Sequence, residues 1–537
     1  MSTGALKSLL ASPPRIVKVA HREPGVGRVG TGVVRAPMGC FRQALMKRPA
    51  QLAATLALIL VAGCEAMVPV NTELADTGLK VPTEWSSASG SASVRQAWLS
   101  DFELSPLPAL VEEAVTANYD LRAASARVAQ ARARARIVGA GRRPQIDAGV
   151  GVSRSGLSTD GGRRVTVDSF NANVAASWEL DVWGRLANDT LAAGRDADAV
   201  SADYDAARLS LAAGVAQAWF DAVESELQVA LAEETVRNFR DNLEIVSEGY
   251  RIGLNDALDV RLERANVAGA ESALEASRID RDGAVRGLEV LLGRYPAGEL
   301  AIAKSLPAIE TEVPAGLPAE ILMRRPDVRA AVLRLEASDE RLNSARKNRL
   351  PDIRLTADGG VSSNALRDLL DFDALVWGIA ADLALPIFQG GRLDAERDLA
   401  RAEVEEVLAD YAQVLLVAFR EVEVALTAER HLARQESALR VAARESEEAD
   451  LLALERYRAG LVEIITWLEA RRRAFNAKSA LIAVSNLRLQ NRIALYLALG
   501  GDFTAAASSA AAAPKTKGAI LVTTTTSESG AAASPRP

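Results

Sequence analysis

The chain is poor in the residues from which most metal sites and covalent active sites are built. Its 537 residues include two histidines, His21 and His431, and two cysteines, Cys40 and Cys64. Because zinc and haem sites need clusters of such side chains, no metal or cofactor is expected. Nothing in the chain matches a nucleotide-binding loop or a nucleophile beside its base. We therefore predict that the protein is not an enzyme.

Neither an excess of one charge nor a long apolar run is present. The formal net charge is -7, and acidic and basic residues are interspersed, so no basic stripe indicates a nucleic-acid partner. The apolar run Leu52–Ala62 falls short of the roughly 20 residues that a membrane-spanning helix needs. With 49 % hydrophobic residues, the chain can still bury a large core, in several domains or in one elongated one.

The strongest positive signal is an internal repeat at a constant offset. Asp120-Leu-Arg-Ala-Ala124 recurs as Asp327-Val-Arg-Ala-Ala331, an offset of 327 − 120 = 207 residues. Solenoid repeats are far shorter, so we interpret the chain as two copies of one domain, 100–300 and 318–503, joined by a linker at 301–317. The same offset relates Pro144 to Pro351, Arg185 to Arg392, Tyr250 to Tyr457, Gly253 to Gly460, and Gly293 to Gly500.

Each copy shows the same order of short elements. Residues 106–143 are rich in Ala, Arg and Leu and predict one helix that ends near Pro144. Alternation of apolar and polar residues predicts strands at 146–152 and 170–182, with a Gly/Ser/Asp-rich loop at 153–162 between them. The second copy repeats this alternation at 353–357 and 377–385.

A very long helix follows each predicted strand pair. Residues 185–250 and 391–456 lack proline, and a helix of about 66 residues would extend about 100 Å, so each needs lateral partners. Shorter helices return at 254–292 and 461–499, after glycines that mark two helix hairpins. The 4-3 spacing of a coiled-coil seam is followed by Val404, Leu408, Tyr411, Leu415, Ala418, Val422 and Ala425.

Four strands cannot close a barrel alone, because about eight is the practical minimum. If their apolar face meets lipid, other chains must close the edges, and a trimer would supply twelve strands. The alternative is a small sheet that packs its apolar face on the helices. Trp178, Trp183, Trp377 and Phe388 fit either an aromatic belt at a membrane interface or packing at the strand–helix junctions.

The N-terminal region resembles a bacterial lipoprotein signal. Met46-Lys-Arg supplies a positive start, and Val61-Ala-Gly-Cys64 is similar to a lipobox. The resemblance implies a signal peptide at 46–63, cleavage before Cys64, lipidation of its thiol, for example by palmitate, and a linker at 64–99. Glu65, in the place of an inner-membrane retention aspartate, favours the outer membrane. A short transmembrane anchor is the alternative.

The two ends of the chain are expected to lie outside the fold. Residues 1–45 are interpreted as a non-native or unstructured upstream segment, with Met46 as the true start. Residues 504–537 are rich in Ala, Ser, Thr and Pro and predict a disordered tail.

Five segments on this duplicated frame resemble the outer membrane efflux protein (TolC) family, in its NodT-like lipoprotein branch. The similarity covers residues 95–503. It implies a mainly α protein with a β-barrel: a homotrimer with a twelve-stranded barrel in the outer membrane, continued into the periplasm by a long α-helical barrel. The segments are Trp178–Arg185 (WELDVWGR), Leu322–Ala331 (LMRRPDVRAA), Leu385–Arg392 (LPIFQGGR), Tyr457–Gly460 (YRAG) and Leu495–Gly501 (LYLALGG).

The resemblance also implies a function. Such proteins are the passive outer membrane channels of tripartite efflux systems, through which small molecules such as drugs or toxic compounds leave the cell. Their partners are a periplasmic adaptor (membrane fusion) protein, an inner-membrane efflux pump and outer membrane lipid. Two alternatives stay open: a protein-secretion duct of the same fold, and a periplasmic coiled-coil lipoprotein that only scaffolds the envelope. The transported substrate is not identifiable from the sequence.

The same resemblance points to a periplasmic gate at the two helix-hairpin turns. Matching positions to the family's lumenal aspartates gives Asp259 and Glu469, with Thr466 where some relatives carry another aspartate. Ile465 matches an apolar constriction. In a trimer, mutual repulsion would raise some of these carboxyl pKa values and draw in cations. Tyr457 and Arg471 are expected to tie neighbouring helices together, whereas Ile464 stands where relatives often carry tyrosine.

Overall fold

The computed structural model describes residues 82, 84–86, 98–102, 106–158, 164–309, 318, 324–367 and 375–503. All of them lie in one compact unit of the chain, Leu74–Pro537. The predicted signal peptide, the lipid anchor Cys64, the segment 1–45 and the tail 504–537 lie outside the described residues, and these expectations stay predictions.

The helices and strands follow the 207-residue offset that the sequence predicts. Corresponding elements are α3 (Tyr119–Ala140) and α7 (Pro326–Lys347), β1 (Gln145–Ser158) and β3 (Asp352–Ser363), α4 (Arg185–Arg251) and α8 (Arg392–Arg458), and α5 (Ala257–Leu291) and α9 (Ile464–Ala498). In each pair the first residues differ by 207, as 326 − 119, 352 − 145, 392 − 185 and 464 − 257. The remaining elements are η2 (Trp98–Phe102), α2 (Leu107–Ala117), β2 (Arg164–Leu180) and β4 (Leu375–Ala384).

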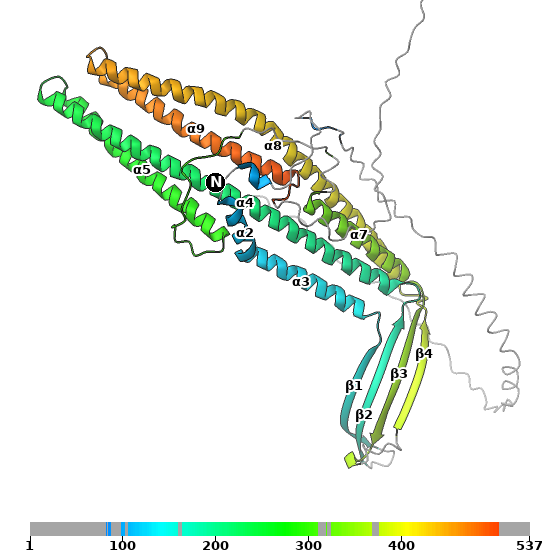
Figure 1. Cartoon of the computed structure of the whole chain (residues 1–537). Coiled ribbons are helices and arrows are strands. Elements are labelled where there is room, and N and C mark those ends of the chain that lie inside the picture. Colours follow the sequence, from blue (N-terminus) through cyan, green and yellow to red (C-terminus); the bar gives the residue numbers. More distant parts are fainter. Residues whose placement is uncertain are drawn as a thin grey trace, which may run out of the picture. The chain divides into compact units, whose positions relative to one another are not determined.

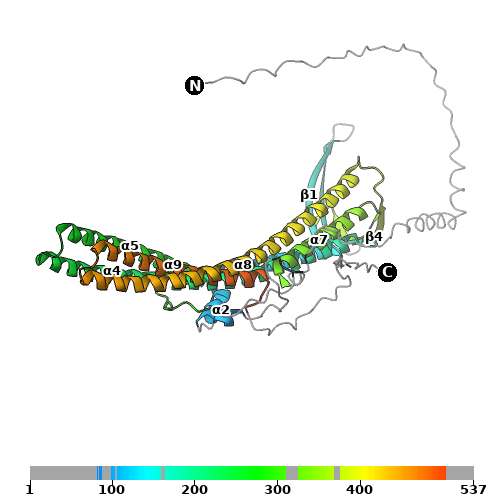
Figure 2. The ribbon, with the colours of Figure 1, turned by 90° about the horizontal axis from the view of Figure 1, so that it is seen from above.

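Two helices of 67 residues each, α4 and α8, form the frame of the molecule. α5 returns along α4, and α9 returns along α8, so that two long hairpins lie side by side through the contact of α4 with α9 (Figures 1 and 2). The predicted seam of α8 is confirmed: its last five members are buried in one cluster, against which Val404 and Leu408 pack. None of the helices in the described ranges is long and apolar enough to span a lipid bilayer.

The largest apolar cluster joins the two copies of the repeat near the C-terminal ends of α5 and α9. It combines residues of η2, α2, α4, α5 and α9. Trp98 stacks on Tyr496 with the ring centroids 5.7 Å apart, and Phe102 meets Phe220 edge to face at 5.3 Å. The N-terminal segment thereby pins the end of α9 to the middle of α4.

The four strands form one antiparallel sheet in the order β1-β2-β3-β4 (Figure 1). The register aligns the apolar residues of neighbouring strands: Val150 pairs with Ala172, and Ala172 with Val361. Because side chains alternate across a sheet, this register gathers the apolar residues on one face and most polar ones on the other. The apolar face is not packed on the helices, since Val150 and Ile379 are both more than three-quarters exposed.

Two of the aromatic residues near the strand ends form hydrogen bonds at the strand–helix junctions. Trp178 donates its indole N–H to the carbonyl of Arg142 at 3.0 Å, and Trp183 donates to the carbonyl of Pro351 at 2.7 Å. Both therefore fix strand–helix junctions. Trp377 is exposed instead, on the apolar face.

Two expectations about element boundaries are wrong. The single helix predicted at 106–143 is two helices, because the extended backbone of Asn118 separates α2 from α3 and its side chain accepts a hydrogen bond from the Leu121 N–H. The predicted loop at 153–162 is strand up to Ser158, because its polar residues pair in register with β2. Alternation of apolar residues fades in this segment, but the backbone ladder does not need it.

The turn glycines offer a matched test of the packing around α5. Gly253 and Gly293 both have left-handed backbones, with φ of 82° and 74°. A Cβ on Gly253 would meet no atom within 4 Å, whereas one on Gly293 would lie 2.7 Å from the carbonyl oxygen of Ala117. We expect Gly253→Ala to cost about 1–2 kcal/mol of unfolding free energy for the backbone alone.

For Gly293→Ala the steric clash should add about 1–3 kcal/mol to that backbone cost. Urea unfolding of the two variants, followed by circular dichroism, measures the difference. Equal costs would contradict the close approach of α5 to α2.

Candidate functional site at the helix-hairpin turns

Each long hairpin ends in a tight turn that glycine makes possible. After α4, Gly253 adopts a left-handed conformation, and the N–H of Leu254 bonds to the carbonyl of Gly249 at 2.7 Å. After α8, Gly460 does the same, and the N–H of Leu461 bonds to the carbonyl of Arg456 at 2.9 Å. These six-to-one bonds close both helices in the same way.

The first predicted gate residue, Asp259, is engaged at the start of α5. Asp256 and Asp259 form a capping box, in which each carboxylate accepts the other's backbone N–H, at 2.9 and 3.1 Å. The Asp259 carboxylate also accepts the side-chain amide of Asn255 at 3.3 Å. Such a box satisfies free N–H groups at a helix start. Asp259 therefore has a structural role at the start of α5.

Tyr457 ties the two hairpins together at their turns. The amide of Asn255 donates to its hydroxyl at 2.9 Å, and this bond joins residues 202 positions apart in the chain. The Tyr457 ring stacks on Trp467 with centroids 5.3 Å apart. Trp467 is buried in a small cluster with Val246 and Ile464, so the predicted tie is confirmed.

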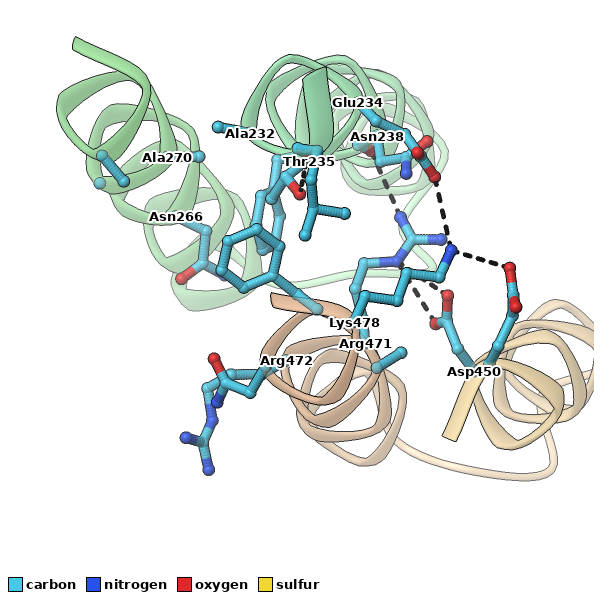
Figure 3. Close-up of a pocket in the computed structure, with 18 of the residues that line it drawn as sticks. Ala232, Glu234, Thr235, Asn238, Asn266, Ala270, Asp450, Arg471, Arg472 and Lys478 are labelled. Atoms are coloured by element: carbon cyan, nitrogen blue, oxygen red, sulfur yellow. Dashed lines mark hydrogen bonds and ion pairs between the residues drawn. The ribbon is translucent and has the colours of Figure 1, made fainter. Parts of the chain in front are cut away.

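Arg471 makes the second tie, among α4, α8 and α9 (Figure 3). Its guanidinium pairs with Asp450 at 3.3 Å and donates to the side-chain oxygen of Asn242 at 3.1 Å. It also lies over the Trp467 ring, 4.9 Å from the centroid, and the Trp467 indole N–H bonds to Asp450 at 3.1 Å. Asn242 and Asp450 were missed by sequence reasoning, because only the rotation of each helix brings them to Arg471.

Glu469 is surrounded by arginines of its own helix. Its carboxylate pairs with Arg472 at 2.9 Å and with Arg473 at 3.0 Å. Hydrogen bonds from Arg473 and then Arg472 hold the pKa of the Glu469 carboxyl below its ordinary value. This direction is opposite to the rise that repulsion between carboxylates predicted, because the nearest charges within the chain are positive.

The other residues predicted near the gate lie at the start of α9 and differ in their exposure. Ile464 is buried, whereas Ile465 is 59 % exposed and Thr466 is exposed as well. An open groove of about 1180 Å³ between the turns is lined by Asp259, Tyr457 and Ile465. Thr466 and Glu469 do not line it. In the described part of the chain, no group of three or more His, Cys, Asp or Glu side chains is placed to hold a metal.

A family model described as outer membrane efflux protein matches residues 110–294 and 317–501, one match for each copy of the repeat. The chain belongs to the outer membrane efflux protein family. It is accordingly an outer membrane efflux channel, in a family of ducts rather than of enzymes.

Individual relatives agree with this assignment. The pyoverdine export outer membrane protein OpmQ of Pseudomonas putida is 33 % identical over 80 % of this chain and 93 % of its own length. The cation efflux system protein CusC of Escherichia coli K12 is 30 % identical over 75 % of this chain and 88 % of its own. A crystal structure of a membrane protein from Pseudomonas aeruginosa superposes with a TM-score of 0.72 and 31 % identity, over 78 % of this chain and 97 % of that one.

Two adjacent arginines provide a matched test of the Arg471 tie. Arg471→Met leaves Asp450 without its cation in a mostly buried setting and removes the bond to α4, so we expect a loss of about 2–4 kcal/mol in unfolding free energy. Arg472→Met removes an exposed pair with Glu469 and should cost less than about 1 kcal/mol. Denaturant unfolding of both variants gives the comparison; similar small losses would mean that Arg471 does not hold the hairpins together.

Proposed function

We propose that three copies of this chain assemble into one passive exit duct, with their sheets joined edge to edge as a closed, twelve-stranded barrel in the outer membrane. The observation that carries this proposal is the sheet of the single chain. Its apolar face is open, and the outer edges of β1 and β4 have no strand partner among the described residues. Inside a bilayer such edges need hydrogen-bond partners, and further copies supply them when β4 of one meets β1 of the next.

Two adjacent residues of β4 test the orientation of this sheet. Ile379 belongs to the apolar face and Ala380 to the opposite face, and both are exposed in the single chain. If the apolar face meets lipid, Ile379→Arg should cost about 2–4 kcal/mol per chain, while an arginine toward the lumen should be tolerated. We expect Ile379→Arg to lower the yield or the melting temperature of the trimer, measured on semi-native gels, and Ala380→Arg to leave both near wild type.

Equal effects of the two substitutions, or wild-type chains that stay monomeric in membranes, would support the periplasmic scaffold in place of the barrel. The same gels distinguish the two readings, because a scaffold does not need a lipid-facing sheet.

The helical part would continue the duct into the periplasm, where it would meet a periplasmic adaptor protein and an inner-membrane pump. This arrangement is supported by the names of the relatives, which belong to export and efflux systems. One of these is named for pyoverdine and the other for cations, so we propose small molecules or ions as the cargo class. A protein-secretion duct is the second candidate, and transport assays with the cognate pump separate the two.

The gate of this duct is proposed to lie at the hairpin turns. Glu469, Asp259, Ile465, Thr466 and Tyr457 would surround the lumen when three chains come together. Support comes from the exposure of Ile465 and Thr466 and from the position of Ile465 one helical turn before Glu469. Six carboxylates at a narrow opening would favour cations.

A pair of neutral substitutions tests the gate. We expect Glu469→Gln with Asp259→Asn to reduce the cation preference of single channels in planar bilayers, because the lumenal charges are removed. The control is Glu445→Gln with Asp282→Asn, which removes the same number of charges from exposed positions away from the turns. Unchanged conductance and selectivity in the gate variant would contradict the placement of Glu469 and Asp259 at the lumen.

The pH dependence of wild-type selectivity follows from the same charges. Since the pKa of Glu469 is lowered, its charge persists from neutral pH through its ordinary value near 4.5 and is lost only as the pH falls further. The contribution of Glu469 to the cation preference, measured in an Asp259→Asn variant, should therefore be retained at pH 5 and decline only in stronger acid.

A further inference from the structure

One buried carboxyl group near the hairpin turns has no part in the contacts of Tyr457 and Arg471 or in the proposed gate. Glu263, on α5, has no solvent exposure. Neither of its carboxylate oxygens accepts a well-formed hydrogen bond from the described residues. A charged carboxylate in this setting is costly unless it is paired, so the side chain is best accommodated with its proton. This burial was not detectable in the sequence, where Glu263 reads as an ordinary helix residue.

The groups around Glu263 come from three helices. Val260, one turn earlier on α5, packs against the cluster that contains Val246 from α4 and Trp467 from α9, so this face of α5 is turned toward that cluster. On α5 itself, the amide of Asn266 favours the charged form. The guanidinium of Arg471, on α9, is the charged group that acts on the carboxyl.

The Arg471 guanidinium already has other partners. It pairs with Asp450 of α8 and bonds to the side-chain oxygen of Asn242 of α4. The amide nitrogen of Asn242, itself buried, has no hydrogen-bond acceptor in the described structure. Among the described residues, a carboxyl group and an amide that lack hydrogen-bond partners thus lie near one arginine that joins three helices.

The balance of these effects favours the neutral carboxyl. Burial raises the pKa of Glu263 from 4.5 to about 7, and the opposing influences of Asn266 and Arg471 do not cancel it. A group that titrates near neutrality inside a helix interface changes the stability of that interface within the physiological range.

We propose that Glu263 is a proton-controlled wedge: its neutral form lets α5 pack against α4 and α9, and its ionised form loosens α5 from them. The direction follows from linkage. The packed state holds the proton more tightly than an opened state in which water solvates the carboxylate. Packing is therefore most favoured in acid, weakens as the pH rises from about 4.5 to about 7, and stays constant above that.

The size of this pH effect is set by the difference between the pKa of Glu263 in the opened state and in the packed state. Each pH unit between the two pKa values changes the ratio of opened to packed states by up to tenfold. Between pH 5 and pH 8 the opened fraction of α5 should therefore rise on the order of a hundredfold. The proposal does not rest on the proposed gate residues Asp259 and Glu469.

Amide hydrogen exchange of the full-length protein in detergent tests this wedge. Peptides that cover residues 257–270 are followed at pH 5 and pH 8, with labelling times scaled to the intrinsic exchange rate. In the wild type, protection should fall on the order of a hundredfold at pH 8 relative to pH 5. In Glu263→Gln, a neutral isostere, protection should be the same at both pH values.

The control is Glu271→Gln on the same helix, whose carboxylate is about half exposed and pairs with Arg240. This variant should keep the wild-type pH dependence. Glu263→Met serves as a second neutral variant if the glutamine side chain disturbs assembly, and it too should be independent of pH. Equal wild-type protection at both pH values, or an unchanged pH dependence in the Glu263 variants, would overturn the proposal, and neither result bears on ion conduction through the gate.

Discussion

Side-by-side packing of two 67-residue helices is the constraint on which the rest of the structure depends. Most of the stability of a helix in a protein comes from packing its apolar face on neighbours, so helices of this length need partners along much of their length. The chain meets this need by folding each long helix against a returning one and by joining the two hairpins through α4 and α9. Alanine dominates the buried positions of α4, and small side chains let adjacent helix backbones approach closely.

Beside the apolar clusters, polar contacts join the hairpins, and these help to decide how α4 and α9 are rotated against each other. Asn486 donates to Asp221, and Gln228 and Ser479 bond to each other, all between α4 and α9. Nearer the turns, Arg471 and Tyr457 continue the same seam. Hydrogen bonds have narrow geometric limits, so they specify one rotation where alanine packing would tolerate several. The proposed gate and the Glu263 wedge both lie at the end of this seam, where a change of rotation would move α5 most.

The sheet differs from the helices in how its apolar side chains are covered. Its register places apolar residues on one face, and the helices leave that face uncovered. A soluble protein usually buries such a surface, and the proposed trimer would cover it with lipid and pair its edges with further copies. Under that proposal, the helical part finds its partners within the chain and the strand part finds them outside it.

The sequence predicts those parts of the fold that local or repeated patterns encode. The 207-residue offset, the proline-free helices and the alternation in the strands are local or repetitive, and the helices and strands appear where these patterns put them. The break at Asn118 was missed because a single capping residue is a weak signal within a helix-rich stretch. The continuation of β1 to Ser158 was missed because backbone pairing, and not apolar alternation, maintains it.

By itself the sequence determined two copies of one unit, the hairpin turns at Gly253 and Gly460, and the family, because each is written in residue types at a constant spacing. Only the tertiary structure decided that Asn255 meets Tyr457, that Asp450 and Asn242 meet Arg471, and that the Glu263 carboxylate is buried with no hydrogen-bond partner among the described residues. These contacts depend on how the long helices are rotated about their axes. That rotation is set by packing between residues up to hundreds of positions apart, which no local pattern records.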